Sequence, residues 1–188
     1  MSPVCVTKTF QREEALLNGR KVVVVDTSDF LDTARPERKT LAEVRKCIKF
    51  CPPGPHVILQ VMRLGWFTQE EKDVARLMKE IFSLKAKDYV IILFTCKADL
   101  EGKTVEKFIA EGYASLKEQV YQCGNRFLAF ENKAGGVEYE AQVGQLMAMI
   151  DALVEKNRAA PCYMEEMFKA DKEHLAKNWG FSWLFPFL

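Results

Sequence analysis

The sequence predicts an α/β fold with a mostly parallel sheet, and two observations support this prediction. Short apolar runs alternate with longer amphipathic stretches along the middle of the chain, which is the order of strand–helix–strand units. The 188 residues, 48% of them hydrophobic, are enough for one domain with its own core. The same composition excludes disordered and collagen-like chains.

Four apolar runs are predicted to form buried strands. The first, at residues 21–26, contains four consecutive valines, and this continuity indicates burial on both faces. A weaker strand at residues 4–10 is expected before it, joined to it through a turn at Asn18-Gly19. The other three predicted strands cover residues 56–64, 89–95 and 126–130.

Helices are predicted between and after these strands. Thr68 and Glu71 form a capping box that opens one helix, whose apolar residues follow the helical period. Pro161 separates the last two predicted helices. The remaining helices are expected at residues 38–50, 104–122, 139–157 and 163–178.

Charge and cysteine content narrow the class of protein. The 27 basic and 26 acidic residues leave a net charge of +1, so no nucleic-acid-binding surface is expected. The six cysteines are scattered and no secretory leader precedes them, which favours free thiols in a cytoplasmic protein. No apolar run reaches the ~20 residues that span a bilayer.

The residues that follow the strands are the candidates for ligand binding, because parallel α/β sheets bind ligands at the carboxyl ends of their strands. Asp26 closes the valine strand, and a carboxylate there suits a magnesium ion held through water. A strand-end aspartate can equally be a helix cap or a turn residue. Lys97 and Asp99 follow a later strand; the carboxylate could accept the N1–H and amine hydrogens of guanine while the lysine stem packs along the base.

Five short segments together resemble the GIMAP family of septin-related guanine-nucleotide-binding domains. The resemblance runs from about residue 4 to residue 157, and its segments are Gly-Arg-Lys-Val-Val-Val-Val-Asp-Thr at 19–27, Pro-Gly-Pro-His at 53–56, Leu-Gly-x-Phe-Thr at 64–68, Leu-Phe-Thr-x-Lys-x-Asp-Leu at 93–100 and Ala-Phe-x-Asn at 129–132.

The resemblance implies a P-loop-NTPase-type G domain with sheet order 2-3-1-4-5-6 and flanking helices. It implies that GTP or GDP and Mg²⁺ bind, with Asp26 at the magnesium water and Lys97 and Asp99 reading guanine. It carries Asn132 onto the loop that contacts the base and Thr7 onto a switch threonine. Thr7 can also be an ordinary edge-strand threonine.

The family's first strand and its Gly-x-x-x-x-Gly-Lys-Ser phosphate loop are not found in these residues. The chain therefore resembles a truncated isoform, expected to bind phosphate and magnesium weakly and to hydrolyse little or no GTP alone. The missing strand would lie between residues 21–26 and 56–64, so direct closure of these two strands or a partner chain is expected. Asp29 in place of a switch glycine and Trp66 in place of an arginine point in the same direction.

Two functions remain open after this comparison. The chain is either a guanine-nucleotide-binding protein of this type or a nucleotide-independent module that pairs with full-length relatives at membranes. Residues 1–157 are expected to form the partial G domain, and residues 158–188 a helix with an aromatic tail. That tail either lies on a membrane surface as a peripheral anchor or packs against its own domain.

Overall fold

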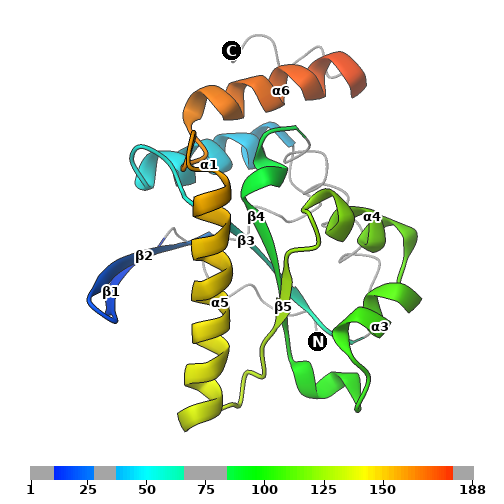
Figure 1. The fold of residues 1–188 in the computed structure, drawn as a ribbon. Helices are drawn as coiled ribbons and strands as arrows, with labels where there is room; N and C mark the ends of the chain where they lie inside the picture. The colour runs from blue at the N-terminus through cyan, green and yellow to red at the C-terminus, as the bar shows by residue number, and fades with distance from the viewer. Residues whose placement is uncertain (1–10, 28–36, 66–83, 180–188) are drawn as a thin grey trace.

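The computed structural model describes residues 11–27, 37–65 and 84–179, in which strands and helices alternate (Figure 1). Three parallel strands form one sheet in the order β3-β4-β5. They are β3 (Ile58–Arg63), β4 (Val90–Thr95) and β5 (Phe127–Ala129). The predicted α/β class is confirmed, and these three strands lie within the predicted runs.

A separate antiparallel hairpin comprises β1 (Gln11–Leu17) and β2 (Arg20–Asp26). Its turn residues Asn18 and Gly19 both have positive φ, at 51° and 79°, as a two-residue hairpin turn of type I′ requires. The predicted turn at Asn18-Gly19 is therefore confirmed. The strand that precedes it is β1, whereas the expected strand at residues 4–10 lies outside the described residues.

The valines of β2 are not buried on both faces, and this expectation was wrong. Val24 is 56% exposed, and Val23 is exposed as well. In the described part of the chain β2 pairs with β1 and not with β3, so direct closure of these two strands does not occur. A two-stranded ribbon without covering layers leaves one or both faces to solvent, however apolar its sequence. The expected single sheet is thus observed as two sheets, divided where the missing strand was expected.

Five described helices flank these sheets. Their bounds are α1 (Glu37–Phe50), α3 (Val105–Glu111), α4 (Ala114–Gln122), α5 (Gly136–Lys156) and α6 (Glu165–Trp179). The single helix predicted at residues 104–122 is two helices, because the chain is extended at Gly112 and Tyr113. The helix predicted to open at Thr68 lies outside the described residues. None of the described helices combines the length and hydropathy needed to cross a bilayer.

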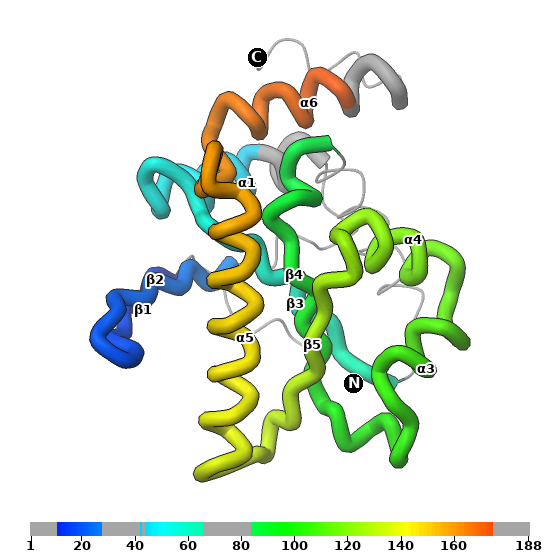
Figure 2. The backbone as a smooth tube through the Cα atoms, viewed as in Figure 1, coloured from blue at the N-terminus to red at the C-terminus, as the bar shows by residue number. Residues whose placement is uncertain are grey.

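The core is built on β4, whose residues from Val90 to Phe94 are all buried. In the view of Figure 2, β5 lies between α5 and the α3–α4 pair. The Phe94 ring meets Phe108 of α3 and Phe127 of β5 edge to face, with centroids 6.1 and 6.5 Å apart. Such ring pairs and the surrounding aliphatic side chains hold β4 in the centre of its sheet.

The amino ends of the strands are closed by α6, which packs on α1 and on the short helix η1 (Ala86–Tyr89). The Asp171 carboxylate of α6 is 1% exposed. It accepts hydrogen bonds from the backbone N–H of Lys85 and Ala86, at 2.6 and 2.9 Å, and from the Tyr163 hydroxyl at 2.7 Å. One buried carboxylate therefore joins α6, η1 and the segment that precedes α6.

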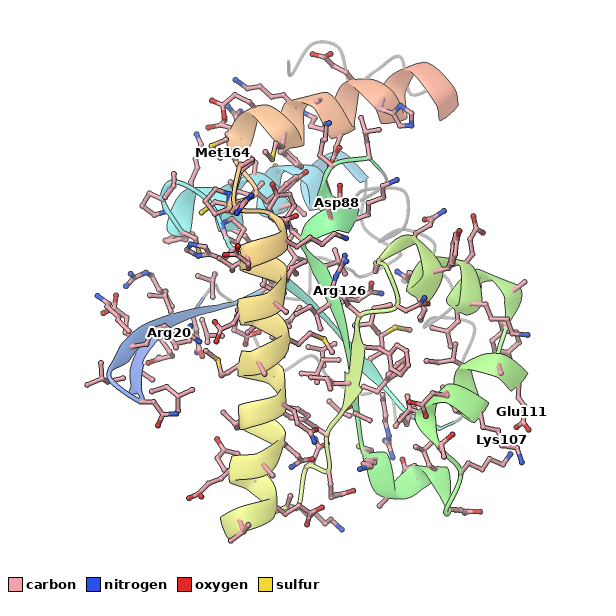
Figure 3. The ribbon with its side chains drawn as sticks, viewed as in Figure 1. Arg20, Asp88, Lys107, Glu111, Arg126 and Met164 are labelled. Carbon is pink, nitrogen blue, oxygen red and sulfur yellow. The ribbon has the colours of Figure 1, made fainter. Side chains whose placement is uncertain are left out.

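Two further contacts secure the same end of the molecule. Arg126, labelled in Figure 3, donates from Nε to the Val90 carbonyl at 2.9 Å and from Nη2 to the Lys87 carbonyl at 2.6 Å. Gly54 is buried against the backbone of Tyr163, where a Cβ atom would meet the Tyr163 carbonyl oxygen at 2.3 Å. This lack of space explains a glycine within the Pro-Gly-Pro-His segment.

Candidate functional site

The carboxyl ends of β3, β4 and β5 lie at the end of the sheet opposite α6 (Figure 1). At the end of β4 the chain turns through Cys96, whose φ of 58° and ψ of 51° are left-handed, into the short helix η2 (Lys97–Leu100). Leu100 is buried in the core cluster and anchors the far end of this helix. As a result η2 presents the exposed residues Lys97 and Asp99 at the end of the sheet.

The loop after β5 is tied to η2 through backbone and side-chain hydrogen bonds. The Lys97 N–H donates to the Phe130 carbonyl at 3.0 Å. The Asn132 side-chain oxygen accepts the Cys96 N–H at 2.8 Å, and the Glu131 Oε2 atom accepts the Ala98 N–H at 2.8 Å. The structure therefore brings Lys97 and Asp99 together with Asn132 at the carboxyl ends of β4 and β5.

Asn132 has a structural part in this site that the sequence did not show. Its oxygen supports the left-handed turn at Cys96, and its contact with a base stays a prediction. Because the Asn132 side chain accepts a backbone donor from the other loop, it sets the spacing between the two loops.

Glu131 is the residue of this site that sequence reasoning missed. Its carboxylate accepts N–H groups from Ala98 and Lys133, at 2.8 and 3.0 Å. These two backbone donors lower the pKa of the Glu131 carboxyl below its usual value. From α5, Gln142 accepts the backbone N–H of Glu131, so the loop is held from both sides. An acceptor residue next to Asn132 was the signal that could have suggested this bridge.

Asp99 points its carboxylate toward the end of β3. Its Oδ2 atom accepts from Arg63, with Nη2 at 3.1 Å and Nε at 3.4 Å. The backbone of Asp99 is fixed independently, because its N–H donates to the Cys96 carbonyl at 2.9 Å. The carboxylate is 38% exposed, so a planar, hydrogen-bond-donating ligand could reach it from solvent.

Of the other two predicted site residues, Asp26 closes β2 in the other sheet and is not part of the site formed by η2 and the loop after β5. The second, Thr7, lies outside the described residues. Within residues 11–27, 37–65 and 84–179, no three histidine, cysteine or acidic side chains come together as metal ligands. A single carboxylate such as Asp26 fits only a magnesium ion that keeps most of its water ligands. Its metal role stays a prediction.

The other candidates for chemistry are unsuited to it. His56 is exposed and precedes β3 at the amino end of the sheet, away from the site. No disulfide joins the described cysteines, which are Cys47, Cys51, Cys96, Cys123 and Cys162. Burial raises the pKa of the Cys123 thiol to about 11, so this cysteine is not an activated nucleophile.

A parallel sheet flanked by helices, with two loops bonded to each other beyond its carboxyl ends, defines the class of protein as an α/β domain. Domains of this class bind ligands at that end of the sheet. The chain belongs to the AIG1 family, whose profile matches residues 1–180. It is 34% identical over 152 residues to human GTPase IMAP family member 8, covering 79% of this chain and 23% of that protein. It is 30% identical over 179 residues to immune-associated nucleotide-binding protein 9 of Arabidopsis thaliana, covering 93% of this chain and 52% of that protein.

The chain thus spans between about a quarter and about half of the length of these relatives. The resemblance drawn from the sequence motifs is confirmed by the family match. The family match also runs past residue 157, while the division of the chain at that residue stays a prediction.

Proposed function

We propose that the chain binds guanine nucleotides through η2 and the loop after β5. The observation that carries this proposal is the position of Asp99, an exposed carboxylate at the end of β4 within two loops that bond to each other. The relatives' names add support, since one is called a GTPase and another a nucleotide-binding protein.

The proposed recognition of the base uses complementary hydrogen bonding. A carboxylate only accepts hydrogen bonds, and one edge of guanine offers N1–H and an exocyclic amine. Asp99 accepts from both groups, and the aliphatic stem of Lys97 packs along the ring. Adenine lacks a donor at N1 and carries no amine at C2, so the site prefers guanine.

The phosphates are bound weakly in this proposal, because residues 1–188 contain no Gly-x-x-x-x-Gly-Lys-Ser segment. A phosphate loop supplies the backbone N–H groups and lysine that hold the outer phosphates. Asp26 supplies the carboxylate for a magnesium-bound water. The 188 residues alone therefore have low GTP affinity and little or no hydrolysis, which depends on positioning and electrostatics.

An interaction module is the second candidate, favoured by the exposed apolar side chains of the hairpin. Leu16 is 75% exposed and Val24 56% exposed. Exposed apolar side chains that gather on one element are typical of surfaces that contact another protein. The proposed partners are other members of the family, in the cytoplasm or at a membrane surface reached through the aromatic tail. Nucleotide-independent binding to a full-length relative would distinguish this role from the first.

The test is a titration of fluorescent GDP, GTP and ADP, with magnesium, into the chain alone and into the same chain preceded by a phosphate-loop segment. We expect binding by the chain to be weak and binding by the extended chain to be strong. Asp99→Asn should lose guanine affinity and gain affinity for xanthosine, because an amide can donate to the oxygen at C2. Asp88→Asn is the matched control, since Asp88 is an exposed carboxylate in η1 at the other end of the sheet (Figure 3).

The two outcomes separate the candidate functions. If the extended chain binds guanine and adenine nucleotides equally, Asp99 does not read the base and the proposal is wrong. If neither chain binds any nucleotide, the interaction role becomes the better account.

A further inference from the structure

Arg63 occupies the carboxylate that the proposed function assigns to guanine. It is the last residue of β3, and both Nε and Nη2 of its guanidinium donate to the same Asp99 oxygen, Oδ2, at 3.4 and 3.1 Å. The side chains of Arg63 and Asp99 are 68% and 38% exposed. The contact is therefore a surface ion pair that water and solutes can reach.

The guanidinium of arginine and the donor edge of guanine share their chemistry. In arginine, Nε–H and an Nη amino group flank one carbon atom and donate side by side. In guanine, N1–H and the exocyclic amine flank C2 in the same way. Both groups offer two neighbouring N–H donors to one carboxylate, and Arg63 bears a positive charge in addition.

We propose that Arg63 is a built-in competitor for guanine, which must displace the Arg63 guanidinium from Asp99 before it can bind fully. This inference rests on the proposed function. Among the described residues the second carboxylate oxygen, Oδ1, accepts no hydrogen bond. A guanine base therefore bonds first to Oδ1 and then exchanges with Arg63 at Oδ2.

Arg63 is not required to hold Asp99 in place. The Asp99 N–H donates to the Cys96 carbonyl, the neighbouring Leu100 is buried, and the Ala98 N–H is bonded to Glu131. The position of the carboxylate thus comes from η2 itself. Replacement of Arg63 removes the ion pair from the Asp99 carboxylate without moving that carboxylate. The affinity for guanine is therefore expected to rise and not to fall.

The size of the effect follows from the exposure of the pair. An exposed ion pair is weak, because water and salt screen it and two long side chains must be ordered. Removal of this competitor should tighten guanine binding about two- to fivefold at low salt. The difference should disappear near 1 M salt, where the screening length falls to about 3 Å.

The test is a nuclear magnetic resonance titration of guanosine into the chain, into Arg63→Met and into Arg158→Met. Guanosine carries no phosphate, so the loss of a positive charge does not by itself change its binding. Arg158 is the matched control because it lies just beyond the end of α5, its side chain is 82% exposed, and it forms an ion pair with Glu155. We expect Arg63→Met to bind guanosine two- to fivefold more tightly, with no change for Arg158→Met.

A second measurement reports on the ion pair without any nucleotide. The Arg63 Nε–H signal should differ between the wild-type chain and Asp99→Asn, and guanosine should shift it in the wild type toward its position in Asp99→Asn. An Nε–H signal that is the same in both proteins shows that the pair is absent in solution and overturns the inference. Equal or weaker guanosine binding by Arg63→Met overturns it too, and leaves the proposed function intact. No guanosine binding by any variant overturns both.

Discussion

The buried carboxylate of Asp171 is predicted to be a main support of the helical end of the molecule. We expect Asp171→Ala to lower the free energy of unfolding at pH 7 by about 3–5 kcal/mol. The substitution leaves the Ala86 N–H and the Tyr163 hydroxyl buried without an acceptor, and each such group costs about 1–3 kcal/mol. The Lys85 N–H is partly exposed and can bond to water instead, so it adds less.

The assay is urea unfolding followed by far-ultraviolet circular dichroism, with Glu173→Ala as control. Glu173 is exposed on the same helix, α6, so its replacement should change the free energy of unfolding by less than about 0.5 kcal/mol. Tyr163→Phe removes one donor and should have an effect between these two. A loss below about 1 kcal/mol for Asp171→Ala would contradict this prediction, because it would mean that the donors find other acceptors.

The pH dependence of this effect has a definite sign. Burial raises the pKa of Asp171 above its ordinary value of 3.8, and the hydrogen bonds from Lys85, Tyr163 and Ala86, with the nearby His174, oppose that rise only in part. The folded chain therefore holds the proton more tightly than the unfolded chain, and stability falls as the pH rises from 3.8 through the folded pKa. The stability advantage of the wild type over Asp171→Ala should accordingly grow as the pH is lowered from 7 toward the ordinary value.

Three further predictions concern packing and the site. Gly54→Ala should destabilise the chain by more than about 2 kcal/mol in urea unfolding, because the added Cβ would lie 2.3 Å from a backbone oxygen. Gly144→Ala should stabilise the chain by about 0.5–1 kcal/mol, because Gly144 lies inside α5 and no atom is within 4 Å of the added Cβ. Gln119 donates to Gln60 at 2.7 Å inside the core while its own oxygen has no partner among the described residues, so Gln119→Leu alone should cost about 1–3 kcal/mol and the double replacement with Gln60→Leu much less. Glu131→Ala should weaken guanine-nucleotide binding several-fold in the fluorescent nucleotide titration. Binding by the wild-type chain should weaken only as the pH falls below about 4.5, because the backbone donors lower the pKa of the Glu131 carboxyl.

Much of the candidate site could be predicted because its parts are local. Buried β-branched runs predict strands, and the residues after parallel strands must meet at one end of the sheet. This argument placed Lys97 and Asp99 at that end, the family resemblance added Asn132, and the structure brings the three residues together. The contacts of Arg63 and Glu131 were not predicted, because their partners Asp99 and Ala98 lie in η2, far from them along the chain, and no spacing in the sequence encodes such contacts.

The α/β class, the hairpin turn at Asn18-Gly19, the three strands of the parallel sheet and the family could all be predicted from the sequence, since each depends on short patterns of residues. The exposure of the β2 valines and the division of the strands into two sheets became visible only in the folded chain. Tertiary structure also decided that one buried carboxylate, Asp171, joins α6 to η1. The physical reason is that burial depends on which layers cover a segment, and that a hydrogen-bond partner far along the chain is chosen by packing and not by local preference.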